Sequence, residues 1–416
     1  MPLATTPNPP HAEAHHHVHG NYSVIRHIYL ARALRDFGDG FVAVLLPVYL
    51  TAIGLGALEV GVVATAALLG SACLTLGVGA LGSRLDQRRL LMAASGLMFA
   101  TGLAFALADT YAVVLLVALV GTINPSSGTV SIFVPLEHAV LSRAVADTER
   151  TRMFARYGLI GALAAAVGAL GAASPDALAA LGVSRMTALQ AMFVAYAVLG
   201  VAGGVAYARI PVDATPPEHR TAAALGPSRR IVYGMAALFS IDAFAGGFAV
   251  QSLVALWLFG KFGLSLSAAG AFFFWSGVLA AFSFPVAAWL SRRIGLVNTM
   301  VYTHIPSSIC LILAAIAPSL ELALGLLLVR AALSQMDVPT RSSYVMAVVT
   351  PPERPAAASV TSVPRSLASA LSPAIAGALF AAGFEAWPLV ICGLLKIAYD
   401  IALLWAFGHV KPPEEK

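Results

Sequence analysis

Val134-Pro135-Leu136-Glu137 and Val338-Pro339-Thr340-Arg341 look like divergent copies of one segment. They lie 204 positions apart, and a second matching pair, Glu149-Arg150 and Glu353-Arg354, has the same separation. Equal spacing within two distant segments is typical of an internal repeat. The sequence therefore predicts a chain of two related halves, in which Glu137 and Arg341 occupy equivalent positions with opposite charge.

The composition places both halves in a lipid bilayer. Of the 416 residues, 59% are hydrophobic and 11% are charged, whereas soluble domains are roughly 25% charged. Long apolar blocks, each near the roughly 20 residues that a transmembrane helix needs, predict an all-α protein. A transmembrane barrel would instead show alternating segments of about ten residues. The twelve expected spans, six per half, lie near 30–53, 57–81, 89–108, 111–138, 154–173, 187–208, 231–260, 266–290, 297–317, 321–349, 357–382 and 387–408.

Basic residues alternate between the loops that join these spans. With the amino terminus inside, the cytoplasmic loops hold fourteen Arg residues, and the outer loops hold Arg185 and Lys261. This positive-inside bias fixes the orientation of a multi-pass protein. It predicts an inner-membrane protein with both termini in the cytoplasm, and it explains the net charge of +5 without a nucleic-acid partner.

The longest connection between spans, at about 209–230, is polar and rich in proline, so we interpret it as a linker between the halves. Residues 1–20 are polar and lack the apolar core of a signal peptide. The predicted organisation is a disordered His-rich cytoplasmic tail at 1–25, an N-terminal six-helix bundle at 26–209, a cytoplasmic linker at 210–229, a C-terminal six-helix bundle at 230–410 and a cytoplasmic tail at 411–416.

The turn after the second span reads Gly79-Ala80-Leu81-Gly82-Ser83-Arg84-Leu85-Asp86-Gln87-Arg88-Arg89. With twelve spans and a central linker, it resembles the Major Facilitator Superfamily, whose turn typically follows G-x-L-a-D-R-x-G-R-R. Gly79, Leu81, Arg84, Arg88 and Arg89 fit this pattern. Ser83 stands where the family usually has Asp, and Asp86 offers an acid from a shifted position. The resemblance implies two pseudo-symmetric six-helix bundles around a solute cavity lined by spans one, four, seven and ten.

The first span carries Arg32, Arg35, Asp36 and Asp39, and helical spacing makes Arg32–Asp36 and Arg35–Asp39 i,i+4 neighbours. One interpretation is that the arginines lie at the interface and the carboxylates only pair with them. The other, supported by a resemblance to proton-coupled drug exporters, is that Asp36 or the deeper Asp39 exchanges a proton. Asp242, in the matching part of span seven, is a third candidate. It has no local cation, so it either faces the cavity or pairs across the bundle.

Span ten carries Arg330, Ser334, Asp337 and Arg341 at separations of four, three and four residues, which predicts one polar helical face, with Gln335 beside it. Asp337 and Arg341 would neutralise each other on one helix. Arg330 has no acid one turn away. It is therefore a candidate for binding an anionic substrate or for pairing with Asp39 or Asp242, and the other polar residues are candidates for the substrate cavity.

Glu137 and Arg341 lie near the cytoplasmic ends of spans four and ten. As equivalent tips of two halves that rock around a central site, they are candidates for a cytoplasmic gate. The alternative is that each residue pairs within its own half.

The amino-terminal tail is rich in histidine, and clustered imidazoles bind Zn, Ni, Cu or Co. The alternative is a disordered tail with incidental metal affinity. The candidate metal ligands are His15, His16, His17 and His19.

No phosphate-binding loop, zinc-protease motif or nucleophile elbow is visible in the sequence. We therefore expect a protein that is not an enzyme and needs no cofactor. The leading prediction is a monomeric secondary transporter, coupled to protons and exporting a small organic compound. The alternatives are a metal-ion or organic-anion transporter of the same fold, or a membrane sensor or scaffold that does not transport.

Overall fold

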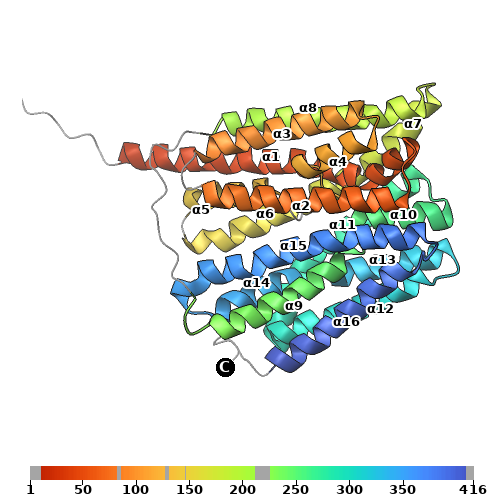
Figure 1. The fold of residues 1–416 in the computed structure, drawn as a ribbon. Helices are drawn as coiled ribbons and strands as arrows, with labels where there is room; N and C mark the ends of the chain where they lie inside the picture. Colours follow the sequence, from red (N-terminus) through yellow and green to blue (C-terminus); the bar gives the residue numbers. More distant parts are fainter. Residues whose placement is uncertain (1–10, 82–85, 127–130, 146, 211–224, 409–416) are drawn as a thin grey trace, which may run out of the picture.

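The computed structural model describes residues 11–81, 86–126, 131–145, 147–210 and 225–408. Within these ranges the chain folds into sixteen α-helices and two short 3-10 helices, and no strand occurs there. The helices run side by side as one bundle (Figure 1). The prediction of an all-α protein is confirmed.

The first half of the chain forms the helices α1 to α8, and each expected span falls on one helix or on consecutive helices. Their bounds are α1 (His11–Ala52), α2 (Ala57–Leu81), α3 (Gln87–Leu107), α4 (Tyr111–Val120), α5 (Phe133–Ala144), α6 (Asp147–Leu170), η1 (Gly171–Ala173), α7 (Ser174–Ala180) and α8 (Arg185–Ala208).

The second half forms the helices α9 to α16 and matches the expected spans in the same way. Their bounds are α9 (Arg229–Gly247), α10 (Gln251–Phe262), α11 (Leu266–Ile294), α12 (Leu296–Ala315), α13 (Leu320–Ser334), α14 (Asp337–Val348), η2 (Pro351–Glu353), α15 (Arg354–Ala381) and α16 (Trp387–Phe407).

Nine of the spans in the described residues are long and apolar enough to cross a membrane. The three other expected spans correspond to α1, to the pair α4 and α5, and to α15. Of these, α1 carries four charged residues between positions 32 and 39. The structure therefore fits the prediction of twelve spans.

Spans four, seven and ten are each divided into two helices. In span ten, α13 ends at Ser334 and α14 begins at Asp337. Pro339 explains this break, because proline has no backbone N–H and its ring clashes with the carbonyl of the residue four positions earlier, here Gln335. The predicted polar stripe of span ten is therefore spread over two helices.

α1 begins at His11, inside the segment for which the sequence predicts disorder. Residues 11–25 contain no proline, so nothing in this stretch prevents the helix of the first span from extending backwards. The prediction that the whole of residues 1–25 is disordered is therefore corrected for the part from His11 onward.

The internal repeat is visible in matching hydrogen bonds. The Arg150 side chain donates through Nε to the Ser142 carbonyl at 3.1 Å, and Arg354 donates in the same way to the Met346 carbonyl at 3.1 Å. Each pair is eight residues apart, and the two pairs are again separated by 204 positions. Equivalent turns of the two halves thus fold alike.

We call the end of the bundle where α8 ends and α9 begins the linker end. It lies at the left in Figure 1. Helices α2 and α15, one from each half, pack closely at the other end, where a Cβ atom on Gly61 would lie 2.4 Å from the Pro373 carbonyl oxygen and 2.8 Å from Gly377 Cα. Such a contact needs glycine. The Ala374 N–H also donates to Thr65 Oγ1 there at 3.0 Å, so the halves are joined at the end opposite the linker.

Candidate functional site

The first of two buried charge clusters lies in the N-terminal half. Arg32 Nε lies 2.6 Å from Asp36 Oδ2, and Arg35 Nε lies 3.3 Å from Asp36 Oδ1. Arg35 also reaches span four, where its Nη1 lies 3.0 Å from Glu137 Oε2. Asp36 and Glu137 are 1% and 0% exposed. We call these four residues the span-one cluster.

Two tyrosines complete the hydrogen bonds of Glu137. Tyr157 on α6 donates to Oε2 at 2.5 Å, and Tyr207 on α8 donates to Oε1 at 2.6 Å. The Arg32 guanidinium also lies over the Tyr157 ring, 4.6 Å from its centroid. Three elements thus hold a carboxylate that the sequence offered as one side of a gate.

Asp39 is buried but sits apart from this cluster. The Tyr196 hydroxyl donates to its Oδ1 at 3.3 Å, and the residue is 2% exposed. The expected pairing of Arg35 with Asp39 is not formed, because the Arg35 guanidinium turns to Asp36 and Glu137. Among the ion pairs of the described residues, none includes Asp39.

The second cluster lies in the C-terminal half around Asp242. Arg341 Nη1 lies 3.1 Å from Asp242 Oδ2 and 2.9 Å from Asp337 Oδ2. Lys396 Nζ lies 2.6 Å from Asp242 Oδ1. Asp242 therefore pairs across the bundle with cations from spans ten and twelve. We call Asp242, Asp337, Arg341 and Lys396 the Asp242 cluster.

A histidine adjoins the Asp242 cluster. His304 Nδ1 lies 3.0 Å from Asp400 Oδ1, and its Nε2 lies 3.4 Å from Lys396 Nζ. Lys396 and Asp400 are not among the site residues predicted from the sequence. The available signal was two ionisable residues four positions apart in the otherwise apolar last span.

Glu137 and Arg341 do not meet in this structure. Each is held within its own half, Glu137 by Arg35 and Arg341 by Asp242 and Asp337. The proposed cytoplasmic gate therefore stays a prediction about a second conformation.

Arg330 pairs with neither Asp39 nor Asp242 here. Its carbonyl oxygen lies 3.4 Å from the Ser307 hydroxyl, which donates to it, and none of the ion pairs in the described part of the chain includes its side chain. Ser334 and Gln335 lie at the break between α13 and α14 and are half-buried. On α15, Arg365 has a buried Nε without a hydrogen-bond partner. The half-buried guanidinium groups of Arg330 and Arg365 thus both lie outside the ion pairs of the described residues.

The turn after the second span connects the start of α3 to the end of α8 by hydrogen bonds. The Asp86 carboxylate caps α3 by accepting from the Arg88 N–H at 3.0 Å. The Arg88 side chain donates to the Ala208 carbonyl at the end of α8 at 2.6 Å, where a cation also interacts favourably with the helix dipole. Arg89 Nε lies 3.8 Å from Asp86 Oδ2. Of the other predicted motif residues, Gly79 and Leu81 lie in the last turn of α2, and Arg84 lies outside the described residues.

Glu353 anchors the described end of the linker. Its carboxylate accepts from the Ser228 hydroxyl at 2.6 Å, from the Thr350 hydroxyl at 2.5 Å and from the Gly226 N–H. These donors favour the charged form and hold the pKa of Glu353 at about 2. The start of the C-terminal half is thereby tied to the turn before α15.

The predicted metal ligands His15, His16, His17 and His19 lie in the first turns of α1, and their side chains lie outside the described part of the structure. Within the described side chains, no group of three or more His, Cys, Asp or Glu could hold a metal ion.

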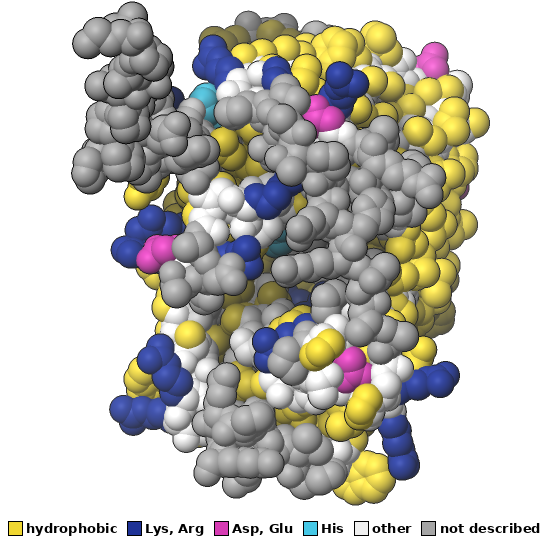
Figure 2. Space-filling model, turned by 90° about the vertical axis from the view of Figure 1, so that its left-hand side faces the viewer, with side chains coloured by type: hydrophobic (Ala, Val, Ile, Leu, Met, Phe, Trp, Pro, Cys, Tyr) yellow, Lys and Arg dark blue, Asp and Glu magenta, His cyan; other side chains and the backbone are white. Residues whose placement is uncertain are grey.

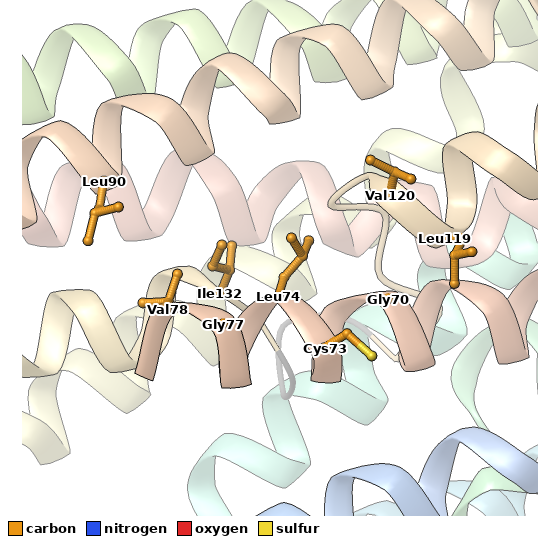
Figure 3. Close-up of a pocket in the computed structure, with 9 residues that line it drawn as sticks. All are labelled: Gly70, Cys73, Leu74, Gly77, Val78, Leu90, Leu119, Val120 and Ile132. Atoms are coloured by element: carbon orange, nitrogen blue, oxygen red, sulfur yellow. The ribbon is translucent and has the colours of Figure 1, made fainter. Parts of the chain in front are cut away.

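A groove of about 510 Å³ opens beside α2, and its lining is apolar (Figure 3). Cys73 and Leu74 of α2 line it together with Leu119 and Val120 at the end of α4. Because these walls carry no charged group, the groove does not suit a polar solute. The buried charge clusters are the better candidates for the functional site.

A bundle of apolar helices in two repeated halves, each with buried ion pairs, is an architecture that membrane transport proteins use. A sequence model of the Major Facilitator Superfamily matches residues 28–334. The chain belongs to this superfamily.

Three similar proteins extend the comparison. An uncharacterized membrane protein of Saccharomyces cerevisiae is 22% identical over 410 residues, which cover 90% of this chain and 92% of that protein. A bacterial homolog of the human lysosomal transporter Spinster, in an inward-facing conformation, has a TM-score of 0.66 at 15% identity, covering 93% of this chain and 95% of that one. The human organic anion transporter MFSD10 has a TM-score of 0.64 at 16% identity, covering 95% and 100%. The two structures share the fold.

Proposed function

We propose that this protein is a secondary active transporter that moves a small solute by alternating access, and that it couples export of an organic compound to protons. The observation that carries the proposal is the pair of buried charge clusters at equivalent places in the two halves. Ionisable side chains inside a membrane are costly and mark substrate or ion pathways. A scaffold that does not transport would have little use for them.

The contacts between the halves support a rocking motion. The halves are joined opposite the linker through Gly61, Gly377 and the Ala374–Thr65 hydrogen bond. At the linker end, Glu137 and Arg341 each pair within their own half. We propose that in the second conformation the linker end closes and these opposite charges approach each other.

We propose that Asp39 carries the coupling proton. Asp36 and Asp242 hold buried cations, so protonating either one would leave a cation without its partner. Asp39 is buried with a single hydrogen bond from Tyr196, and its protonation leaves no cation unpaired. It is also the deeper of the two span-one carboxylates.

The distribution of surface charge supports the orientation. Figure 2 shows Lys and Arg side chains gathered around the linker end. By the positive-inside rule, we propose that this end of the bundle faces the cytoplasm, together with both termini. We propose an inner-membrane location, with export running from this side.

A proteoliposome assay with an imposed proton gradient and a panel of organic solutes tests the proposal. Asp39→Asn should abolish solute-dependent proton flux, and Asp109→Asn, which changes an exposed carboxylate, should leave it intact. Flux that survives neutralisation of Asp36, Asp39 and Asp242 in turn would contradict the carboxylate scheme. Absence of flux for every solute would favour the sensor or scaffold alternative.

A second candidate substrate class is an organic anion. Arg330 lies outside the ion pairs of the described residues, and Arg365 has a buried Nε with no acceptor. Guanidinium groups bind carboxylates in a bidentate manner. MFSD10, which shares the fold, is described as an organic anion transporter. In this case Arg330→Ala and Arg365→Gln should each abolish uptake of benzoate while the protein still inserts normally, and retained uptake would exclude the candidate.

A further inference from the structure

Four ionisable side chains form a buried chain across three helices of the C-terminal half. His304 lies on α12, Lys396 and Asp400 lie one turn apart on α16, and Asp242 lies on α9. His304 is 3% exposed and Asp400 is 0% exposed. The proposed coupling residue Asp39 lies in the other half, so these four side chains form a separate group.

The partners of His304 define its neutral tautomer. A carboxylate only accepts, so Nδ1, which lies 3.0 Å from Asp400 Oδ1, carries the hydrogen. An ammonium only donates, so Nε2, which lies 3.4 Å from Lys396 Nζ, is the acceptor. Lys396 directs another hydrogen to Asp242 Oδ1 at 2.6 Å. Both ring nitrogens are therefore satisfied while the ring is neutral.

We propose that His304, together with Asp400, is a proton-binding site whose occupancy decides whether Lys396 or His304 holds Asp242. A proton that binds at Nε2 turns this nitrogen into a donor. It can then no longer accept from Lys396, and two positive groups face each other. Asp242 Oδ1, 3.9 Å from Nε2, becomes the acceptor of the new N–H. When the proton leaves Nε2, Lys396 regains its bond to the ring.

The hydrogen-bonded group by itself carries a formal charge of −1 while the ring is neutral. It holds two cations, Lys396 and Arg341, and three carboxylates, Asp242, Asp337 and Asp400. The Arg365 guanidinium acts electrostatically on Asp242 and Asp337 from outside these hydrogen bonds. Asp400 Oδ2 is buried without a hydrogen-bond partner, so this end of the group is short of donors.

Other titratable groups around the ring do not replace these partners. The Tyr399 ring centroid lies 6.2 Å from that of His304. On α13, the Arg330 carbonyl accepts from Ser307, one turn beyond His304. Arg365 of α15 lies outside the hydrogen bonds of the group. The response of His304 to a proton therefore passes mainly through Asp400, Lys396 and Asp242.

The position of Asp242 connects this site to transport. Its second oxygen, Oδ2, is bound by Arg341 on α14. A change of partner at Oδ1 can therefore alter the contacts of both span seven, which carries Asp242, and span ten, which carries Arg341. These are the spans that the superfamily resemblance places at the cavity. The use of the proton in transport rests on the proposed function, whereas proton binding itself does not.

Infrared pH-difference spectroscopy of the full chain in nanodiscs, with ring-labelled histidine, tests the site. Between pH 5 and pH 8, the wild type should show one more titrating imidazole than His304→Gln, in which the amide side chain can keep both contacts in uncharged form. The matched control, His138→Gln, removes a histidine that packs against Phe154 and Tyr157 and should leave the His304 signal unchanged.

Two further variants test whether proton binding at His304 depends on its partners Asp400 and Lys396. Asp400→Asn and Lys396→Met should each change the imidazole signal of His304, because each removes one of the two hydrogen-bond partners of the ring. Equal imidazole signals in the wild type and His304→Gln, or a His304 signal that neither variant changes, would overturn the site. An intact signal without proton-coupled flux in proteoliposomes would overturn the transport proposal alone.

Discussion

The two halves place ion pairs at equivalent positions but build them differently. In the span-one cluster, Asp36 takes its cations, Arg32 and Arg35, from its own helix. In the Asp242 cluster, the equivalent Asp242 takes Arg341 from α14 and Lys396 from α16. A pair within one helix persists when helices move, whereas pairs between helices depend on their packing. At the central carboxylate, helix movement can therefore exchange partners in the C-terminal half, whereas in the N-terminal half the pair between helices is that of Arg35 with Glu137.

The largest effect should come from neutralising the central carboxylate in each half. Asp242→Asn leaves Lys396 without its anion while Asp337 still holds Arg341, and removing one partner of a buried pair costs about 3–5 kcal/mol. Asp36→Asn should destabilise less, because Arg32 keeps the Tyr157 hydroxyl and ring face and Glu137 still holds Arg35. Thermal unfolding in detergent measures both variants. Equal destabilisation would show that the two halves do not differ in this way.

A double variant tests whether the destabilisation comes from the abandoned cation. Asp242→Asn combined with Lys396→Met removes the anion and one of its cations together. It should recover part of the stability lost in Asp242→Asn alone. A double variant that is destabilised by the sum of both single changes would argue against direct coupling.

A smaller effect is expected at the contact that joins the halves. Gly61→Ala places a Cβ 2.4 Å from the Pro373 carbonyl oxygen, and overpacking typically costs about 1–3 kcal/mol. The matched control is Gly325→Ala, whose Cβ would have no neighbour within 4 Å. The unfolding temperature should fall for Gly61→Ala and stay near that of the wild type for Gly325→Ala. A similar small change in both would show that this contact does not join the halves tightly.

The smallest effect should appear at the linker anchor Glu353, whose equivalent in the N-terminal half, Glu149, is exposed. The pKa of Glu353 lies at about 2, below its ordinary value of 4.5, so the anchor's stabilisation is fully present above pH 4.5 and is lost as the pH falls toward 2. Glu353→Gln should lower the unfolding temperature slightly at pH 7, and this difference should shrink below pH 4. A difference that is constant with pH would contradict the assignment.

The fold could be predicted from the sequence more fully than the site. Apolar blocks and the 204-residue repeat are properties of continuous stretches, so they gave the spans and the two halves. Pro339 explains the break in span ten, but span seven breaks after Gly247 without a proline. Partner choice for Glu137 depends on Tyr157 and Tyr207, which lie 20 and 70 residues away. Such contacts depend on the rotation of packed helices, which local spacing does not determine.

If the halves move against each other at the linker end, the separation of two residues there differs between the two conformations. Spin labels at the equivalent positions Arg143 and Ala347, with the three native cysteines replaced, report this separation. We expect two distance populations whose ratio changes between pH 5 and pH 8, with the shorter one depleted in Glu137→Gln. A single population with the same distance at both pH values would contradict it.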